Sequence, residues 1–437
     1  MKKALIVVAA VAASPVLFGG EPNYDESKVG PYHLESPVEF ADGTPLKSAS
    51  KWPKRRAEIV DIFAREMYGR IPPKPEALVT ELEEEGPTFA GLGLRKQYRM
   101  WFKADKSGPS VRWLVVVPTH AKAPVPPILM LNYGGNHEML NDGQVILSKG
   151  WLKNSTAVGI TNHQATAKTR GCQRRSENRS GVNVGQLLAR GYGFMTACYG
   201  DISPDPDFRK QPELFWKVVW TGVFSLWPEN DPTSGDNITS LGAWAWGLSR
   251  GLDLAERIPE IDATRAVVTG CSRLGKAALL AASRDERFKV CVPNQTGGGG
   301  APLAKRNYGE NLTTEKRSFP HWYCNNYWKY EPDPQTMPFD QHLLLASIAP
   351  RALLIEGFNK GWFDTKGEYL SCKAASAAWE FLGQPGLPKG DFPESFDEGL
   401  IGERLGYVRR EGEHGLSDYD WKWLLDFADR ALGKGRK

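Results

Sequence analysis

The chain has 437 residues, of which 41% are hydrophobic and 24% are charged, and its formal net charge is +4. This composition is typical of a soluble globular protein, and it argues against the clustered basic face of a nucleic-acid-binding protein. The length accommodates one large α/β domain or two smaller ones. The six cysteines lack the paired short spacing of a zinc site, and we expect Cys271 and Cys291, in apolar strand-like runs, to be buried thiols.

A short apolar segment follows a positively charged start. Lys2 and Lys3 precede an apolar run over residues 4–18, and Gly19 and Gly20 follow it. This pattern predicts a secretory signal peptide, too short to span a bilayer, and a buried first helix is the alternative. We expect residues 1–20 to be the signal and residues 21–437 a single domain that is secreted or periplasmic, with no membrane partner.

Predicted strands and helices alternate along most of the chain. Helices are expected over residues 51–68, 184–189, 241–258, 368–382 and 419–431, and strands over 98–102, 111–118, 126–132, 191–199, 266–269, 288–293, 352–356 and 405–409. Residues 201–236 read as a Pro-rich, aromatic insertion over the strand ends, where ligands bind in open sheets. The alternation predicts an α/β fold with a mostly parallel sheet flanked by helices, a three-layer α-β-α sandwich.

Three aspartates open the insertion: Asp201, Asp205 and Asp207. A calcium loop would need a glycine and a distal glutamate, and neither completes the pattern. We therefore expect a solvated turn.

The strand and helix in the middle of the chain are joined by a sharp turn. Gly270, Gly275 and Lys276 fit a phosphate-binding loop, but Ala277 stands where that loop needs a Ser or Thr for magnesium. Ser272 fits a nucleophile elbow, in which a serine occupies a strained turn between strand and helix. There the second glycine comes one residue late, so each motif is incomplete by one residue.

The position of His414 favours the elbow. An α/β-hydrolase carries its triad in the order Ser, acid, His, and His414 lies between the last predicted strand and the last helix. A phosphate-binding loop would normally follow the first strand, and export would remove the chain from ATP. His321 and His342 precede the penultimate strand and fit the order less well. The sequence therefore predicts an α/β-hydrolase fold that needs no metal or cofactor.

Ordered motifs from about residue 51 to the C-terminus resemble those of one family, the glucuronoyl esterases of carbohydrate esterase family 15. The motifs are Gly270-Cys-Ser-Arg-Leu-Gly-Lys276, Ala243-Trp-Ala-Trp-Gly-Leu-Ser-Arg250, Asp285-Glu-Arg-Phe288, Arg306-Asn-Tyr-Gly-Glu310, Phe319-Pro-His-Trp322, Phe339-Asp-Gln-His342, Ile348-Ala-Pro-Arg351, Trp362 with Lys366-Gly-Glu368, and Tyr407 through His414. The resemblance implies a serine esterase that hydrolyses the ester between glucuronic acid on xylan and lignin alcohols.

The resemblance also implies roles for individual residues. Ser272 would be the nucleophile, His414 its base, and Arg273 a stabiliser of the oxyanion through its backbone N–H and its guanidinium. Three further residues would contact the sugar: Lys276, Glu310 and Trp362. We expect a monomer that acts on glucuronoxylan or a lignin–carbohydrate ester and binds no nucleic acid.

The triad acid departs from the family pattern. The resemblance places Gln295 and Lys360 at the two positions where the family carries a carboxylate, and Glu356 is the nearest substitute. An amide can orient the histidine but cannot stabilise its charged form as a carboxylate does, so we expect slow turnover. An esterase for another carbohydrate ester, such as acetyl xylan, and a catalytically impaired binder of uronosyl polysaccharide remain as alternatives.

Overall fold

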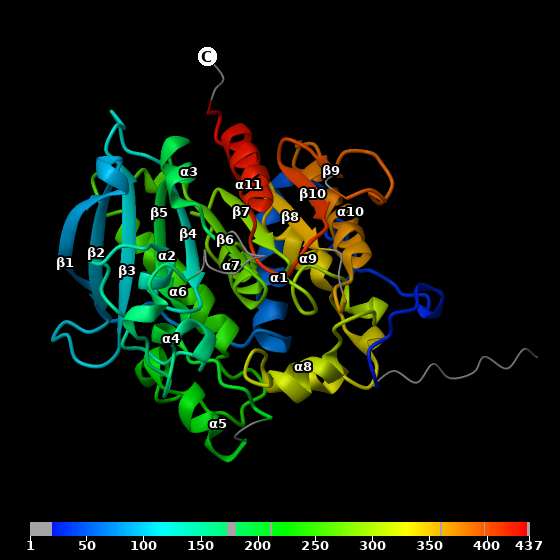
Figure 1. Ribbon diagram of the computed structural model, residues 1–437. Coiled ribbons are helices and arrows are strands. Elements are labelled where there is room, and N and C mark those ends of the chain that lie inside the picture. Colours follow the sequence, from blue (N-terminus) through cyan, green and yellow to red (C-terminus); the bar gives the residue numbers. More distant parts are fainter. Residues whose placement is uncertain (1–19, 173–180, 210–211, 359–360, 397, 435–437) are drawn as a thin grey trace, which may run out of the picture.

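The computed structural model in Figure 1 describes residues 20–172, 181–209, 212–358, 361–396 and 398–434, so the predicted signal peptide lies outside it except for Gly20. Within these ranges ten strands form one sheet, in the order β1-β2-β3-β5-β4-β6-β7-β8-β10-β9. The strands are β1 (Val79–Thr88), β2 (Gly93–Trp101), β3 (Ser110–Pro118), β4 (Pro127–Asn132), β5 (Gly193–Cys198), β6 (Val267–Cys271), β7 (Val290–Asn294), β8 (Ala352–Phe358), β9 (Glu398–Ile401) and β10 (Leu405–Arg410).

Parallel strands make up the middle of this sheet. Strands β5, β4, β6, β7, β8 and β10 run parallel to one another, whereas β1, β2 and β3 are added antiparallel at one edge and β9 at the other. Side chains of the central strands alternate between two buried clusters, one on each face. In β4, for example, Leu129 belongs to one cluster and Ile128 to the other. A strand buried on both faces reads as a continuous apolar run, which is why these strands were predictable.

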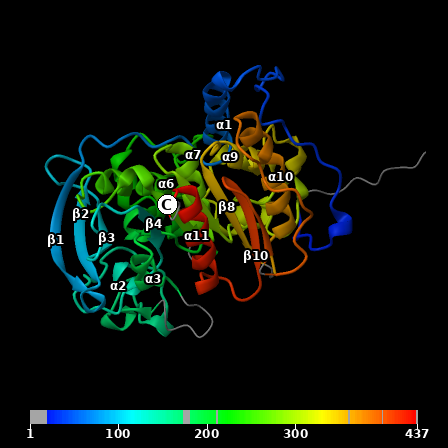
Figure 2. The same ribbon diagram turned by 90° about the horizontal axis from the view of Figure 1, so that it is seen from above.

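Helices cover both faces of the sheet (Figure 2). One face carries α1 (Trp52–Glu66), α6 (Ser240–Ala255), α7 (Arg273–Arg284), α9 (Gln341–Ala346) and α10 (Thr365–Phe381), and the other carries α2 (Asn136–Met139), α3 (Val184–Ala189) and α11 (Asp418–Ala431). The short helix α4 (Tyr199–Ile202) directly follows the carboxyl end of β5, and α5 (Pro212–Val219) and α8 (Leu312–Ser318) lie at the same end of the molecule (Figure 1). The predicted fold class is confirmed.

The antiparallel edge strand β1 was not predicted. Its residues 81–85 are mostly glutamates rather than β-branched or aromatic residues. Three of these glutamates form ion pairs with basic residues of β2 and β3, namely Glu83 with Arg112, Glu84 with Arg95 and Glu85 with Lys96. Cross-strand charge pairing therefore supports this strand where apolar burial does not, and an apolar pattern could not reveal it.

The burial of the cysteines agrees with a further expectation. All six cysteines lie in the described part of the chain and are buried, as expected for Cys271 and Cys291. Among the described residues, no helix combines the length and the apolar character that crossing a membrane requires.

Candidate active site

Ser272 occupies the sharp turn between β6 and α7. Its backbone has φ 60° and ψ −132°, a left-handed conformation that strains any residue other than glycine. Two backbone hydrogen bonds hold the turn: Ser272 N–H donates to the Asn294 carbonyl at 2.9 Å, and Lys276 N–H donates to the Ser272 carbonyl at 3.0 Å. This is the geometry of a nucleophile elbow.

Two glycines allow the strand and the helix to approach. A Cβ on Gly270 would lie 2.3 Å from the Leu274 carbonyl oxygen. A Cβ on Gly275 would lie 2.8 Å from the Asn294 oxygen and 2.9 Å from the Gly270 oxygen. No side chain fits at either position, so the glycine that comes one residue late in the motif still provides the close packing that the elbow requires.

The elbow opens onto a cavity of about 510 Å³. Its lining includes Ser272, Arg273 and His414, which come from α7 and from the loop before α11. Tyr133, in the loop after β4, also lines it and donates a hydrogen bond from Oη to the Cys271 carbonyl at 2.7 Å. The candidate nucleophile and the candidate base therefore share one cavity at the carboxyl ends of the parallel strands, where open α/β sheets bind ligands.

Gln295 holds the ring of His414. The Gln295 Oε1 atom lies 2.8 Å from His414 Nδ1 and accepts the Gly415 N–H at 3.0 Å. The same amide donates from Nε2 to the Gly415 carbonyl at 3.0 Å. Because the Gly415 peptide offers a donor to one end of the amide and an acceptor to the other, it determines which atom of Gln295 faces the histidine.

The locked amide also determines the tautomer of His414. Since Gln295 presents an oxygen, Nδ1 of the ring carries the proton and Nε2 keeps its lone pair. That is the tautomer in which an imidazole accepts a proton from a serine hydroxyl. In the serine protease case, replacing the triad Asp by an amide yields the wrong tautomer. Here the Gly415 peptide prevents that outcome.

Aromatic side chains pack around His414. The centroid of its ring lies 5.2 Å from that of Phe363 and 6.0 Å from those of Phe358 and Trp362. Trp362 remains 47% exposed, so it is not a core residue. Its carbonyl accepts the Glu310 N–H at 2.9 Å, which joins the two loops that carry these candidate sugar contacts.

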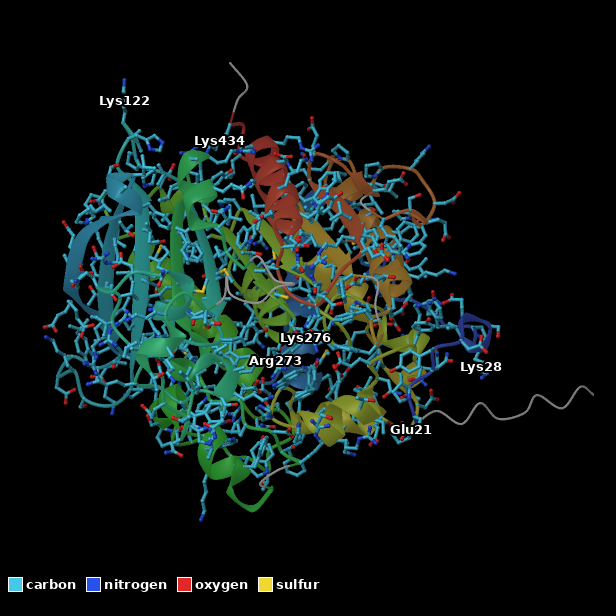
Figure 3. All side chains as sticks on the ribbon, viewed as in Figure 1. Glu21, Lys28, Lys122, Arg273, Lys276 and Lys434 are labelled. Atoms are coloured by element: carbon cyan, nitrogen blue, oxygen red, sulfur yellow. The ribbon has the colours of Figure 1, made fainter. Side chains whose placement is uncertain are left out.

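Lys276 lies in a buried group of charges beside Arg273. Its side chain is 2% exposed, and its Nζ lies 3.5 Å from Glu310 Oε2 and 3.5 Å from Glu315 Oε1. It also sits 4.7 Å from the centre of the Trp322 ring. Burial raises the pKa of Glu315 to about 7, although the charge of Lys276 opposes that rise. Figure 3 places Lys276 and Arg273 near the middle of the molecule, away from the other labelled side chains at its periphery.

Arg273 is held by a buried carboxylate. Its Nη1 pairs with Asp205 Oδ2, while Asp205 Oδ1 accepts from His321 Nε2 at 2.8 Å and from Trp322 Nε1 at 3.0 Å. The guanidinium lies 4.7 Å from the centre of the Trp322 ring and 5.2 Å from that of Phe319. Burial alone would raise the pKa of Asp205, but the charge of Arg273 and the hydrogen bonds from His321 and Trp322 hold it well below its usual range.

The expectation of a solvated turn at the three aspartates is wrong for Asp205. Asp205 is 2% exposed, and burial raises the pKa of Asp201 to about 6. Asp207 does lie near the surface, where it pairs with the exposed Arg209. The insertion folds back toward the elbow so that Asp205 reaches Arg273, a contact that local composition could not indicate. Across the described ranges no group of three or more His, Cys, Asp or Glu residues is placed to hold a metal ion.

Comparisons with known proteins agree with this geometry. A family model described as "Glucuronyl esterase, fungi" matches residues 224–383. The carbohydrate esterase MZ0003 from an unknown prokaryotic organism is 34% identical over 94% of this chain and 93% of its own length. The glucuronoyl esterase of Solibacter usitatus superposes with a TM-score of 0.84 at 34% identity, over 94% of this chain and all of that one. The chain belongs to the glucuronoyl esterases of carbohydrate esterase family 15.

More distant members of the glucuronoyl esterase family are longer. The 4-O-methyl-glucuronoyl methylesterase of Cerrena unicolor is 26% identical over 83% of this chain, which spans 64% of that relative. The resemblance to carbohydrate esterase family 15 drawn from the sequence motifs is thus confirmed, and so is the assignment to carboxylic-ester hydrolases.

Glu356, the nearest substitute for the triad acid of this esterase, lies at a different place in the network. Asn294 Nδ2 donates to its Oε2, and none of the hydrogen bonds between described residues joins it to His414. Burial, together with the charge of Asp420, raises the pKa of Glu356 well above its ordinary value. The carboxyl group of Glu356 is therefore not placed to supply negative charge to the histidine. The other position that the family pattern suggests, Lys360, lies outside the described residues.

We therefore expect Glu356→Gln to keep at least about a third of the wild-type kcat, because Glu356 makes no hydrogen bond to His414 among the described residues and glutamine keeps its shape and can still accept from Asn294. Initial rates on a glucuronate ester, with a thermal melt to confirm folding, measure this. A loss of more than about a hundredfold in a folded variant would make Glu356 the acid after all.

Four residues of the site to which the sequence assigned no role share one property. Each is a buried polar or aromatic group that acts through tertiary contacts: Glu138, Asp205, Glu315 and Trp322. Glu138 follows the loop after β4 and lines the cavity, and burial raises its pKa to about 7. A signal existed for Trp322 alone, because it closes the motif Phe319-Pro-His-Trp322.

Proposed function

We propose that the protein is a serine esterase that hydrolyses esters between 4-O-methyl-glucuronic acid on glucuronoxylan and lignin alcohols. The observation that carries the proposal is the cavity in which Ser272, on a strained elbow, lies with Arg273 and with His414 in the tautomer that accepts a proton. Membership of the glucuronoyl esterase family and the methylesterase name of its fungal relatives support the substrate class.

In the proposed reaction, Ser272 Oγ attacks the carbonyl carbon of the ester while His414 Nε2 takes the hydroxyl proton. The resulting oxyanion is stabilised by the backbone N–H and the guanidinium of Arg273, fixed donors that meet charge as it develops. Collapse breaks the bond to the alcohol, which leaves with the proton from the imidazolium. Water then hydrolyses the glucuronoyl-enzyme by the same route in reverse. Gln295 keeps the imidazole oriented throughout.

We assign recognition of the uronate hydroxyl groups to three residues that are linked to the cavity through the contact of Trp362 with His414: Lys276, Glu310 and Trp362. Lys276 and Glu310 offer a donor and an acceptor from a desolvated group, and the half-exposed indole of Trp362 offers an apolar face. We further propose that the protein is exported by its N-terminal signal, that residues 21–437 form one domain, and that it acts as a monomer.

Replacing Lys276 by alanine should weaken the binding of glucuronic acid by about ten- to a hundredfold, because a buried charge-assisted hydrogen bond is worth about 1.5–3 kcal/mol. Calorimetric titration measures this directly. Lys289→Ala, at an exposed lysine on the surface, is the matched control and should leave the affinity unchanged. Equal affinities for wild type and Lys276→Ala would remove Lys276 from the sugar site.

The proposed function is tested by comparing two esters on the purified protein. Benzyl glucuronate presents the uronate ester, and an acetylated xylan oligosaccharide presents the alternative carbohydrate ester. We expect hydrolysis of the first, at least about a hundredfold preferred in kcat/KM over the second, and no hydrolysis by Ser272→Ala. Preference for the acetyl ester would replace the proposal by an acetyl-xylan esterase. Binding of glucuronic acid without turnover of either ester would replace it by a polysaccharide binder.

A further inference from the structure

The guanidinium of Arg273 is paired in the active site with a buried carboxylate, that of Asp205. The Asp205 carboxylate is buried and accepts from Arg273, His321 and Trp322, so that both of its oxygens are engaged. It comes from the insertion after β5, 68 residues away from Arg273 in the chain. Burial and the neighbouring charge of Arg273 lower the pKa of His321, so its ring is neutral and its Nε2–H is the donor to Asp205.

The pairing engages one part of the guanidinium and leaves another without a partner. Nη1 is taken by Asp205, whereas Nε is a buried donor with no hydrogen-bond partner among the described residues. The guanidinium carbon lies 4.7 Å from the centre of the Trp322 ring and 5.2 Å from that of Phe319, and these two rings stack at 3.8 Å. Asp205 therefore holds Nη1, Nε is buried, and the side chain packs against an aromatic pair, so Nη2 is the nitrogen that is neither paired nor buried.

Substrate, transition state and product differ in the number of hydrogen-bond donors that they need from Arg273. The ester is neutral at the reacting carbon, and the transition state places charge on one oxygen, which a single fixed donor can stabilise. The product is a carboxylate with two oxygens, which an arginine binds most strongly through two parallel N–H donors. A free guanidinium beside Ser272 would thus hold the product more firmly than the reaction needs.

We propose that Asp205 is a positioning residue that keeps Arg273 available to the oxyanion of the transition state and prevents it from binding the glucuronate product through two parallel N–H donors. This inference rests on the proposed function. By occupying Nη1 and cancelling the net charge of the guanidinium, Asp205 weakens the product complex, and by fixing the side chain it preserves the oriented donor. The preference for the transition state over the product therefore comes from the Arg273–Asp205 pair, and not from Arg273 alone.

The test is the isosteric variant Asp205→Asn, with Asp207→Asn as control because Asp207 pairs with Arg209 on the surface. Asp205→Asn should bind glucuronate about tenfold more tightly than wild type in calorimetry, since release of Arg273 Nη1 adds one charge-assisted hydrogen bond to the product. Its kcat should fall about tenfold, while KM for the neutral methyl ester of glucuronic acid stays within about threefold. A damaged site would weaken both ligands, so tighter product binding is a readout that misfolding cannot imitate.

A second variant keeps the inference testable if Asp205→Asn does not fold. Arg273→Met combined with Asp205→Asn removes the buried pair as a whole and leaves no unpaired charge. The double variant should lower kcat by at least about a hundredfold and change glucuronate affinity by less than threefold, because the neutral pair contributes little to product binding. Weaker or unchanged glucuronate binding by folded Asp205→Asn, or a change of glucuronate affinity above threefold in the double variant, would overturn the proposal. The titrations need no turnover, so they remain decisive even if the wild type hydrolyses no glucuronate ester.

Discussion

Replacing Ser272 by alanine should lower kcat on benzyl glucuronate by about 10⁵ to 10⁶, the scale of loss found when a serine hydrolase loses its nucleophile. The substitution leaves the cavity, Arg273 and the His414–Gln295 pair in place, but no atom remains at the elbow to form the acyl-enzyme. Relief of the left-handed backbone does not follow, because alanine at φ 60° is strained like serine.

The same variant also tests the covalent step. A serine-directed phosphonate should add one label to the wild type, detected by intact mass, and none to Ser272→Ala. Ser225→Ala, at an exposed serine that donates to the Gly222 carbonyl, is the control and should label and turn over as the wild type does. A label that persists in Ser272→Ala, or full activity of that variant, would assign the nucleophile elsewhere.

Gln295→Leu should lower kcat by about 10³ to 10⁴, close to the cost of losing the third member of a serine triad. Leucine removes the acceptor of both the His414 Nδ1–H and the Gly415 N–H, so the ring loses its orientation and its fixed tautomer. Rates over a pH series, with circular dichroism to confirm folding, measure the effect. Near-wild-type rates would show that the loop and the aromatic residues orient His414 without Gln295.

Gln295→Glu should act in the opposite direction and raise kcat by about ten- to a hundredfold, because a carboxylate stabilises the imidazolium that forms as Ser272 attacks. The pH below which activity falls should move upward for the same reason. The gain is limited by the Gly415 carbonyl, which accepts from the Gln295 amide in the wild type and would face a carboxylate oxygen in the variant. An unchanged rate at all pH values would mean that proton transfer through His414 does not limit turnover.

The elements that the sequence predicted well are those whose side chains repeat a pattern. Strand β6 and helix α7 are apolar runs separated by glycine, and Ser272 and His414 were found because chain order and turn chemistry are local properties. Strand β1 was not predicted because its glutamates form ion pairs with residues of β2 and β3 and follow no apolar pattern. The sugar-binding candidates required a family motif, since spacing alone does not separate Lys276 from a surface lysine.

Two features of the site could only be seen in three dimensions. Asp205 looked like part of a solvated turn, and it is buried only because the insertion brings it to Arg273. Gln295 looked like a weakened triad member, whereas the amide orientation that makes it serviceable depends on the Gly415 peptide, 120 residues further on. Contacts of this kind are set by tertiary packing and leave no periodic trace in the sequence.

The glutamate-rich edge strand bears on how the protein behaves in crowded solution. The outer edge of a sheet is a template on which another copy can add a strand, and long neutral edges start fibril-like growth. In β1 the exposed Glu81 and Glu85 and the Pro87 ring, which lacks an N–H, interrupt that template. A further strand added to β1 would have to remove water from these carboxylates, which are already paired within the molecule, and would find no N–H at Pro87, so β1 is a poor template for a neighbour.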